Sequence, residues 1–262
     1  MKVNIVYNEK IPEYAQTLQA VEQELARYNI EFCSFDIAEM QNYGDFTITL
    51  GGDGTILRTA RFYTDYKTPV LGINMGRLGF LSQPESIQEI IKAVADGKYY
   101  TEERLMLCSG LYTALNDFVI KGCNQSRSSK FYLEINDNVV CNYIADGIII
   151  STPTGSTAYG LSAGGPVLYP TLDSIVIVPI CPHTLNARPL VVPSKEKIAI
   201  KTSDMLLSVA IDGYDTIKCI DKIAIEASDK KATLAFLNER KFYSILRSSL
   251  HWGIPPENIA QI

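Results

Sequence analysis

The first hundred residues alternate short apolar runs with segments in which apolar positions recur every three or four residues. Short apolar runs are typical of buried strands, and the three-and-four spacing, as in the segment after Pro12, is typical of one face of a helix. We therefore predict strands at residues 3–6, 30–35, 46–50 and 70–74, and helices at residues 14–28, 56–63 and 86–95. Gly97 is the expected stop of the last helix. Strands that alternate with helices predict a parallel sheet with helices on both faces.

Beyond residue 100 the pattern becomes mostly β, with turn signals about every ten residues. Strand-like segments occupy residues 105–113, 114–120, 131–135, 139–143, 147–151, 174–179, 190–192, 197–201, 206–211, 222–226 and 232–237. The triplet Asn136-Asp137-Asn138 is a hairpin turn signal. Residues 242–250 are predicted to form a closing helix.

These patterns predict an α/β N-terminal domain with a parallel sheet, followed by a β-rich, sandwich-like C-terminal domain. We place the first domain at residues 1–100 and the second at residues 101–237. We expect the segment 238–262 to return to the first domain.

Composition and charge narrow the class of protein. The 262 residues are 47% hydrophobic and 20% charged, which is ordinary for a globular protein. A net charge of −5 without a long basic run argues against a dedicated nucleic-acid binder. Without a signal sequence or a long apolar run, we expect a cytoplasmic protein that does not span a membrane. The six scattered cysteines are expected to be reduced core thiols, and the presence of only two histidines argues against a His-rich metal site.

A glycine-rich turn, Gly51-Gly52-Asp53-Gly54-Thr55, directly follows the predicted strand 46–50. Glycines let the backbone approach a ligand closely, and their N–H groups at the start of a helix favour phosphate. A carboxylate beside phosphate is electrostatically unfavourable unless Asp53 accepts a proton, orders a hydroxyl or holds a metal ion. The alternative is a plain tight turn in which Asp makes local hydrogen bonds. The spacing matches neither the P-loop nor the dinucleotide-binding glycine motif.

A second block covers residues 146–166. An apolar strand at residues 148–150 ends in a cluster of hydroxyl side chains: Ser151, Thr152, Thr154, Ser156 and Thr157. Hydroxyls and glycine amides together can bind phosphates and sugar hydroxyls. The alternative for such a cluster is a solvated loop.

These blocks together resemble the NAD kinase family, over most of the chain. The motifs that match are residues 51–55, 72–81, 114–117, 146–166, 182–189 and 211–213. Lipid kinases, diacylglycerol kinases and phosphofructokinases share the first motif only. Many bacterial members have Arg where this chain has Ile144. The resemblance implies a kinase that transfers the γ-phosphate of ATP, or of polyphosphate, to the 2′-hydroxyl of the adenosine ribose of NAD and makes NADP.

The resemblance also implies roles for individual residues. Asp53 is the expected catalytic residue, accepting the proton of the ribose 2′-hydroxyl or orienting that oxygen. Gly54 and its neighbours would bind the nucleotide phosphates, and Asn116 with Asp117 would bind the adenine-side nucleoside. Phe80 would stack on the adenine, with ordinary core packing as its alternative.

Further positions follow from the same resemblance. The segment that lines the NAD site would comprise Thr157, Ala158, Tyr159, Gly160, Leu161 and Ser162. Asp146 matches a family position at the nicotinamide end of NAD. Lys130 could meet a phosphate or be solvated, Arg58 could reach the ATP phosphates or be a surface arginine, and Tyr214 matches a variable binding position.

The resemblance implies Mg²⁺ or another divalent cation that arrives with ATP, since the sequence contains no dedicated metal cage. It implies NAD and ATP as small-molecule substrates and a homodimer or homotetramer in which neighbouring subunits complete the NAD site. Two alternatives remain open: a kinase of another small alcohol, lipid or sugar, and a nucleotide-sensing module without turnover.

Overall fold

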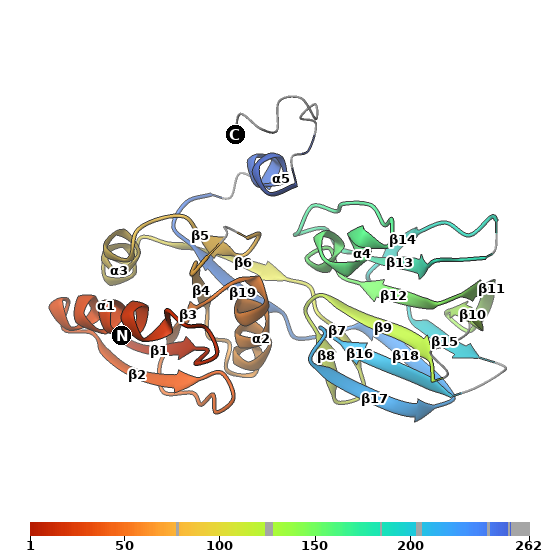
Figure 1. Cartoon of the computed structure of the whole chain (residues 1–262), viewed down its shortest axis with the longest axis horizontal. Coiled ribbons are helices and arrows are strands. Elements are labelled where there is room, and N and C mark those ends of the chain that lie inside the picture. The colour runs from red at the N-terminus through yellow and green to blue at the C-terminus, as the bar shows by residue number, and fades with distance from the viewer. Residues whose placement is uncertain are drawn as a thin grey trace. The chain divides into compact units, whose positions relative to one another are not determined.

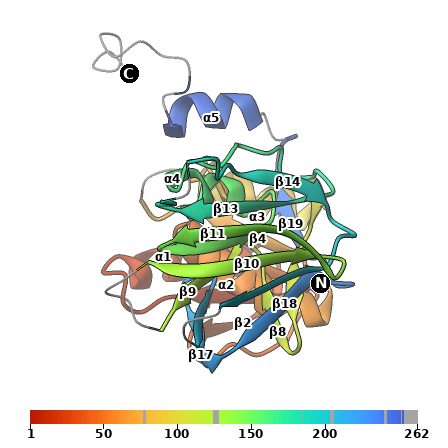
Figure 2. The ribbon, with the colours of Figure 1, turned by 90° about the vertical axis from the view of Figure 1, so that its right-hand side faces the viewer.

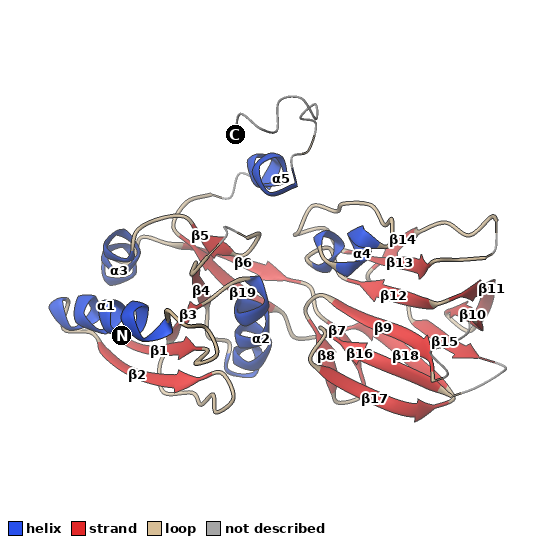
Figure 3. Cartoon of the chain, in the orientation of Figure 1, coloured by secondary structure: helices blue, strands red, loops and turns tan. Residues whose placement is uncertain are grey.

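The computed structural model describes residues 1–76, 79–123, 128–183, 185–202, 206–239, 242–250 and 252 (Figure 1). The chain divides into two compact units. The first comprises Met1–Glu102 together with Thr233–Ile262, and the second comprises Glu103–Ala232. The two units differ in secondary structure: most helices lie in the first unit, and the second is built mainly of strands (Figure 3).

The first unit is built on a sheet whose strands run in the order β2-β1-β3-β4-β19-β6, with β5 paired to β4. The strands are β1 Lys2–Tyr7, β2 Glu31–Asp36, β3 Phe46–Leu50, β4 Val70–Ile73, β5 Ser82–Gln83, β6 Tyr100–Arg104 and β19 Ala232–Phe236. All pairings from β2 to β19 are parallel, which confirms the predicted parallel sheet. The helices are α1 Tyr14–Arg27, α2 Asp53–Tyr63, α3 Ile87–Ala95 and α5 Phe242–Leu250.

Helices cover both faces of this sheet. Apolar residues of α1 and α3 share one buried cluster with alternate residues of β3 and β4, such as Ile48 and Leu71. Because successive side chains of a strand point to opposite faces, Gly72 belongs to the other face. A Cβ at Gly72 would lie 2.2 Å from Cδ1 of Ile56, so α2 packs closely on that second face.

The stop of α3 follows the predicted glycine signal, and its start is fixed by a capping box. The hydroxyl of Ser86 accepts a hydrogen bond from the Glu89 N–H, and the Glu89 carboxylate accepts one from the Ser86 N–H, which forms a capping box. Gly97 follows the helix with φ of +65°, a conformation that glycine adopts without strain.

The second unit contains, in its described residues, two six-stranded sheets whose pairings are antiparallel (Figure 2). One runs β11-β10-β15-β18-β7-β8 and the other β14-β13-β12-β9-β16-β17. The strands of the first are β7 Leu107–Ser109, β8 Tyr112–Ala114, β10 Ser129–Ile135, β11 Asn138–Ala145, β15 Ile198–Thr202 and β18 Lys222–Ala227. Those of the second are β9 Asp117–Gly122, β12 Gly147–Ser151, β13 Ser174–Ile180, β14 Leu190–Pro193, β16 Leu207–Ile211 and β17 Asp215–Ile220.

A single buried cluster joins the two sheets of the second unit. It includes Phe118 of β9 and Ile150 of β12 from one sheet, and Phe131 of β10 and Ile200 of β15 from the other. The sheets therefore face each other across a shared core, and the β-rich, sandwich-like prediction is confirmed.

Several predicted strands have different bounds. The predicted strand 105–113 is a hairpin of β7 and β8, because Gly110 turns the chain with φ of +58°. The predicted strand 114–120 begins only at Asp117, since the N–H groups of Leu115 and Asn116 bond a side chain instead of a neighbouring strand. Strands β5, β6 and β17 were not predicted. The hairpin turn signal is confirmed, with Asn136 and Asp137 at φ of +50° and +62°.

The expected reduced thiols are observed, but the expected core position is wrong for the five cysteines whose side chains the structure describes; Cys219 lies outside them. Cys33, Cys108 and Cys141 are partly exposed and Cys123 and Cys181 are exposed, all five as free thiols. Cys123 and Cys181 directly follow the ends of β9 and β13, where the chain leaves the core. No helix in the described part of the chain has both the length and the apolar character needed to cross a membrane.

Candidate active site

Asp53 is the first residue of α2 and follows β3 after a two-residue turn. Its Oδ2 accepts a hydrogen bond from the Phe80 N–H at 2.6 Å, and its Oδ1 accepts one from the Leu81 N–H at 3.0 Å. The carboxylate is therefore held by the loop that follows β4, at the edge where the parallel strands β3 and β4 both end. Open α/β sheets bind their ligands at this edge.

The loop approaches the carboxylate so closely that any side chain at position 79 would displace it. A Cβ on Gly79 would lie 2.2 Å from Oδ1 of Asp53 and 2.4 Å from its Cγ. On the other side of Asp53, Gly52 and Gly54 are exposed at the N-terminus of α2. That helix end favours anions, because the aligned peptide dipoles of the helix leave a partial positive charge there.

Phe80 and Arg58 lie in the same unit but differ in their surroundings. Phe80 is half-buried and its backbone contacts Asp53. Arg58 is within electrostatic reach of Asp36 at the end of β2. Burial raises the pKa of Asp36, but backbone hydrogen bonds from Ala38 and Glu9 and the charge of Arg58 outweigh it, so the net pKa is lowered. Arg58 therefore has an acidic neighbour, Asp36, within the chain itself, whether or not it also contacts a nucleotide.

In the second unit, Asp212 organises the segment that contains Asn116 and Asp117. Asp212 lies in the turn between β16 and β17 with φ of +49°. Its carboxylate accepts three backbone hydrogen bonds, from Leu115 at 2.9 Å, Asn116 at 2.7 Å and Asp117 at 3.0 Å. The bend before β9 is therefore built around one side chain.

The hydroxyl cluster after β12 joins the same network. The Thr152 hydroxyl donates to the Leu115 carbonyl at 2.6 Å and accepts from the Gly155 N–H at 3.1 Å. The Asn116 carbonyl accepts from the Thr152 N–H at 2.8 Å and from the Ser151 hydroxyl at 3.1 Å. A Cβ at Gly155 would lie 2.3 Å from the Asn116 carbonyl oxygen, so the two segments are in close contact.

The hydroxyl cluster is not a solvated loop. Ser151, Thr152, Thr154 and Ser156 are all buried. The Ser156 hydroxyl donates to the Pro153 carbonyl and accepts from the Leu168 N–H at 3.0 Å. These side chains fix the backbone, and the residues after them present their atoms to solvent.

The segment predicted to line the ligand site is a 3₁₀ turn, Gly155–Thr157, followed by the short helix α4, Tyr159–Ser162. Tyr159 is 40% exposed, Ser162 is exposed, and Thr157, Ala158 and Leu161 are partly exposed. Gly160 is buried and faces the protein. The segment therefore offers a hydroxyl-rich and aromatic surface next to Asn116 and Asp117.

Asp117 is a buried carboxyl group with a second carboxylate nearby. Only 4% of the residue is exposed. Burial, and secondly the negative charge of Asp212, raise the pKa of Asp117 to about 7. Near neutral pH this group can therefore act as a hydrogen-bond donor as well as an acceptor.

Comparison with known proteins identifies the family. The model of the ATP-NAD kinase N-terminal domain matches residues 3–99, and that of the ATP-NAD kinase C-terminal domain matches residues 115–237. The chain belongs to the NAD kinase family. The resemblance predicted from the sequence is thus confirmed.

Individual relatives agree with this assignment. An NAD kinase of Magnetococcus marinus is 41% identical over 235 residues, which cover 83% of this chain and 76% of the relative. The crystal structure of an NAD kinase from Archaeoglobus fulgidus in complex with ATP matches with a TM-score of 0.79 and 28% identity, covering 96% of this chain and 99% of that one. A yeast NADH kinase complexed with NADH has the same fold, with a TM-score of 0.82 and 23% identity over 97% of this chain and 89% of that one.

Not all of the residues predicted from the NAD kinase resemblance lie together. Lys130 is on β10, in the other sheet from Asn116, and its Nζ lies 5.3 Å from the centre of the Tyr132 ring. Asp146 is exposed at the start of β12, whereas the hydroxyl cluster follows the end of that strand. Tyr214 is 46% exposed, beside the Asp212 turn. Within one chain, Lys130 and Asp146 are thus separated from the Asn116 segment.

Three residues were missed by sequence reasoning. Asp212 was quoted only as part of a matching motif, although its carboxylate holds the Asn116 segment. Lys121 and Lys218 line a pocket that also includes Tyr159 and Gly213. The polar–apolar alternation of residues 216–219 is the signal that could have revealed β17, and with it the place of Lys218.

Proposed function

We propose that this protein is an NAD kinase that transfers the γ-phosphate of ATP, or a terminal phosphate of polyphosphate, to the 2′-hydroxyl of the adenosine ribose of NAD. Membership of the family supports the reaction. The observation that supports the site is the Asp53 carboxylate, which two backbone N–H groups hold at the N-terminus of α2. A turn that only reverses the chain has no need for this arrangement.

In the proposed step, the ribose 2′-oxygen forms a bond to the γ-phosphorus while the bond from that phosphorus to the β–γ bridging oxygen breaks. Asp53 accepts the proton of the 2′-hydroxyl or orients that oxygen for attack. A positioned base contributes roughly 10²- to 10⁴-fold to a rate. Phosphoryl transfer has a loose transition state, so alignment of the two substrates accounts for much of the remainder.

The nucleoside contacts follow from the second unit. Asn116 and Asp117 bind the adenine-side nucleoside, and Thr157 to Ser162 line the same site. Asp117 can donate a hydrogen bond from its protonated carboxyl, since burial raises its pKa to about 7. Phe80, whose ring is half-buried, stacks on the adenine.

A divalent cation enters with the donor in this proposal. Among the described residues, no group of three or more His, Cys, Asp or Glu side chains could hold a metal ion. When bound to the donor's phosphates, Mg²⁺ neutralises their charge. Asp53 is the described carboxylate next to the anion-favouring helix end, and it fits a contact to such a complex.

A second copy of the chain completes the site. Asp146 is at the opposite end of β12 from the hydroxyl cluster, so a single chain does not bring it to Asn116. Strand β11 forms one edge of its sheet and exposes Val139, Val140 and Ile144 to 64%, 48% and 46%. An exposed apolar edge of this kind favours self-association, which supports a homodimer or homotetramer. Free thiols are compatible with a cytoplasmic location.

One assay tests the proposal directly. Purified protein is incubated with NAD, Mg²⁺ and either ATP or polyphosphate, and NADP is measured. NADP formation is the expected result, with diacylglycerol and fructose 6-phosphate left unmodified under the same conditions. Nucleotide binding without NADP from any donor would favour the sensing module, and phosphorylation of a lipid or sugar would favour the other kinase class.

A further inference from the structure

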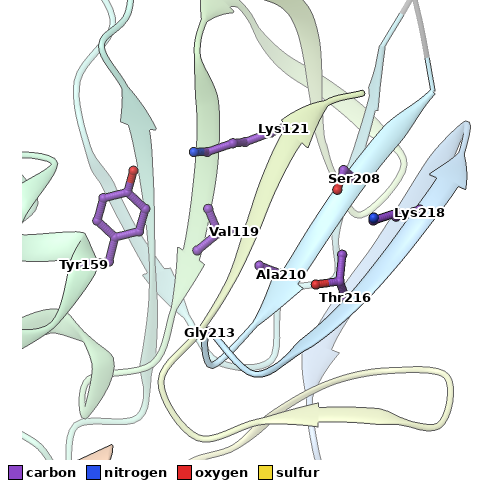
Figure 4. Close-up of a pocket in the computed structure, with 8 residues that line it drawn as sticks. All are labelled: Val119, Lys121, Tyr159, Ser208, Ala210, Gly213, Thr216 and Lys218. Atoms are coloured by element: carbon purple, nitrogen blue, oxygen red, sulfur yellow. The ribbon is translucent and has the colours of Figure 1, made fainter. Parts of the chain in front are cut away.

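A pocket of about 470 Å³ lies on the outer face of β9, β16 and β17, beside α4 (Figure 4). Its walls and floor are Val119, Lys121, Tyr159, Ser208, Ala210, Gly213, Thr216 and Lys218. All of these residues belong to the second unit. The volume is within the range of small-molecule sites.

Strand register explains the shape of this pocket. Ser208 of the central strand β16 is paired with Lys121 on one side and Lys218 on the other. Ala210 is the next residue of β16 on the same face. Because the central strand contributes these two small side chains, it forms a floor, and the longer side chains of β9 and β17 form walls.

The two lysines give this pocket a positive charge. Neighbouring strands are about 4.8 Å apart, so Lys121 and Lys218 start roughly 10 Å from each other on either side of Ser208. Figure 4 shows the ammonium end of Lys121 pointing to the side where Tyr159 stands, and Lys218 and Thr216 turning their polar ends toward β16. None of the lining residues is acidic, and neither lysine forms an ion pair with a described residue.

Another lysine pair in the same unit differs from the pocket lysines because it has an acidic partner. Lys201 and Lys222 are directly opposite each other on β15 and β18. The chain supplies their counter-charge itself, because the Glu134 carboxylate pairs with Lys201 and lies 3.0 Å from Lys222. Ser208, which lies between Lys121 and Lys218 on β16, is neutral, and no lining residue of this pocket is acidic.

We propose that this pocket binds a condensed phosphate group, a diphosphate or a longer chain. Two ammonium groups can contact successive phosphoryl groups, and the hydroxyls of Ser208, Thr216 and Tyr159 can donate hydrogen bonds to their oxygens. A local positive pocket attracts such an anion even on a chain of net charge −5.

The pocket lies on the same face of β9 as the predicted nucleoside residue Asp117. Residues two apart on a strand share a face, so Asp117, Val119 and Lys121 lie in one row along β9, and Phe118 and Ile120 point into the core. This inference rests on the proposed function, whose two substrates both contain condensed phosphate. The occupant is either the phosphate chain of the donor or the diphosphate of the dinucleotide.

Calorimetric titration of the full-length protein with inorganic tripolyphosphate tests this site. The variant Lys121→Gln/Lys218→Gln is expected to bind at least about tenfold more weakly than wild type, and its binding is expected to depend less steeply on salt. Lys121→Arg/Lys218→Arg should retain binding. Lys197→Gln is the control, because this 75% exposed lysine pairs with Glu226 elsewhere in the unit. Equal affinity of the Gln double variant and wild type, with matching thermal unfolding, overturns the proposal.

Steady-state kinetics then distinguish the two sources of phosphate. A higher KM for ATP or polyphosphate with an unchanged KM for NAD assigns the pocket to the donor, and the reverse pattern assigns it to the dinucleotide. The titration does not depend on turnover. A protein that binds tripolyphosphate through these lysines but makes no NADP would retain this site and refute the proposed reaction.

Discussion

The backbone nitrogen of Phe80 lies 2.6 Å from Oδ2 of Asp53, although the two residues are 27 positions apart. Leu81 makes the matching contact to Oδ1. Both oxygens of the carboxylate are thus held by one loop, while the backbone of Asp53 belongs to α2. The direction in which this carboxylate points consequently depends on the loop after β4 as much as on the glycine turn.

Gly79→Ala tests this dependence. The new methyl group would occupy space 2.2 Å from Oδ1 of Asp53, and a side-chain carboxylate can move away more easily than backbone can. We expect kcat to fall by about 10- to 100-fold, because small misplacements of catalytic groups cost rate of this order. The free energy of unfolding should change by less than about 1 kcal/mol, since the strain is relieved by one side chain.

Gly76→Ala is the matched control for this variant. A Cβ at Gly76 meets no described atom within 4 Å, so kcat should stay close to that of wild type. If Gly79→Ala retained wild-type kcat, the loop would not determine the position of the carboxylate.

The buried carboxyl of Asp117 predicts a dependence of stability on pH. Its pKa is raised from 3.8 to about 7 on folding, so between these values the folded chain binds more protons than the unfolded chain. The stabilisation that Asp117 gains from this extra proton is therefore fully present below about pH 4. It is lost as the pH rises through about 7. Urea unfolding midpoints of wild type and Asp117→Asn at pH 5 and pH 8 measure it. The wild type should lose more stability over this interval, and parallel behaviour of the two proteins would contradict the assignment.

Asp212→Ala tests the organising role of the carboxylate between β16 and β17. The variant removes the acceptor of three backbone N–H groups, from Leu115, Asn116 and Asp117. Leaving buried donors unpaired costs about 1–3 kcal/mol, so the free energy of unfolding measured with urea should fall by about that amount. The KM for NAD should rise as well, because the bend that presents Asn116 loses its support.

The control for this variant is Asp229→Ala, which removes the same charge at an exposed position. It should leave both the unfolding free energy and the KM near their wild-type values. An Asp212→Ala protein as stable as this control would show that the bend is held by other contacts.

The secondary structure was predictable where one signal dominated. The apolar run of β3, the Gly97 stop of α3 and the Asn136-Asp137 turn each predicted the observed feature. Strand β17 was missed because half of its positions are polar and its pairing with β16 depends on a turn at Asp212 and Gly213. The hairpin of β7 and β8 was merged into one strand because only the conformation of Gly110 divides it.

The candidate site was predictable as a set of motifs but not as a network. The glycine-rich and hydroxyl-rich motifs can be recognised from the sequence alone. The contacts of Asp53 with Phe80, and of Asp212 with Asn116, join residues that are distant in sequence, and only the folded chain defines them. The same holds for the lysines of the pocket, which three strands bring together.

The most direct test of the account is the turnover of Asp53→Asn, measured together with its Kd for NAD. Asparagine preserves the size of the side chain and one acceptor for the loop, but it cannot take the proton of a ribose hydroxyl. The account predicts that kcat for NADP formation falls by roughly 10²- to 10⁴-fold while the Kd for NAD changes by less than about threefold. A variant that makes NADP at close to the wild-type rate would contradict it.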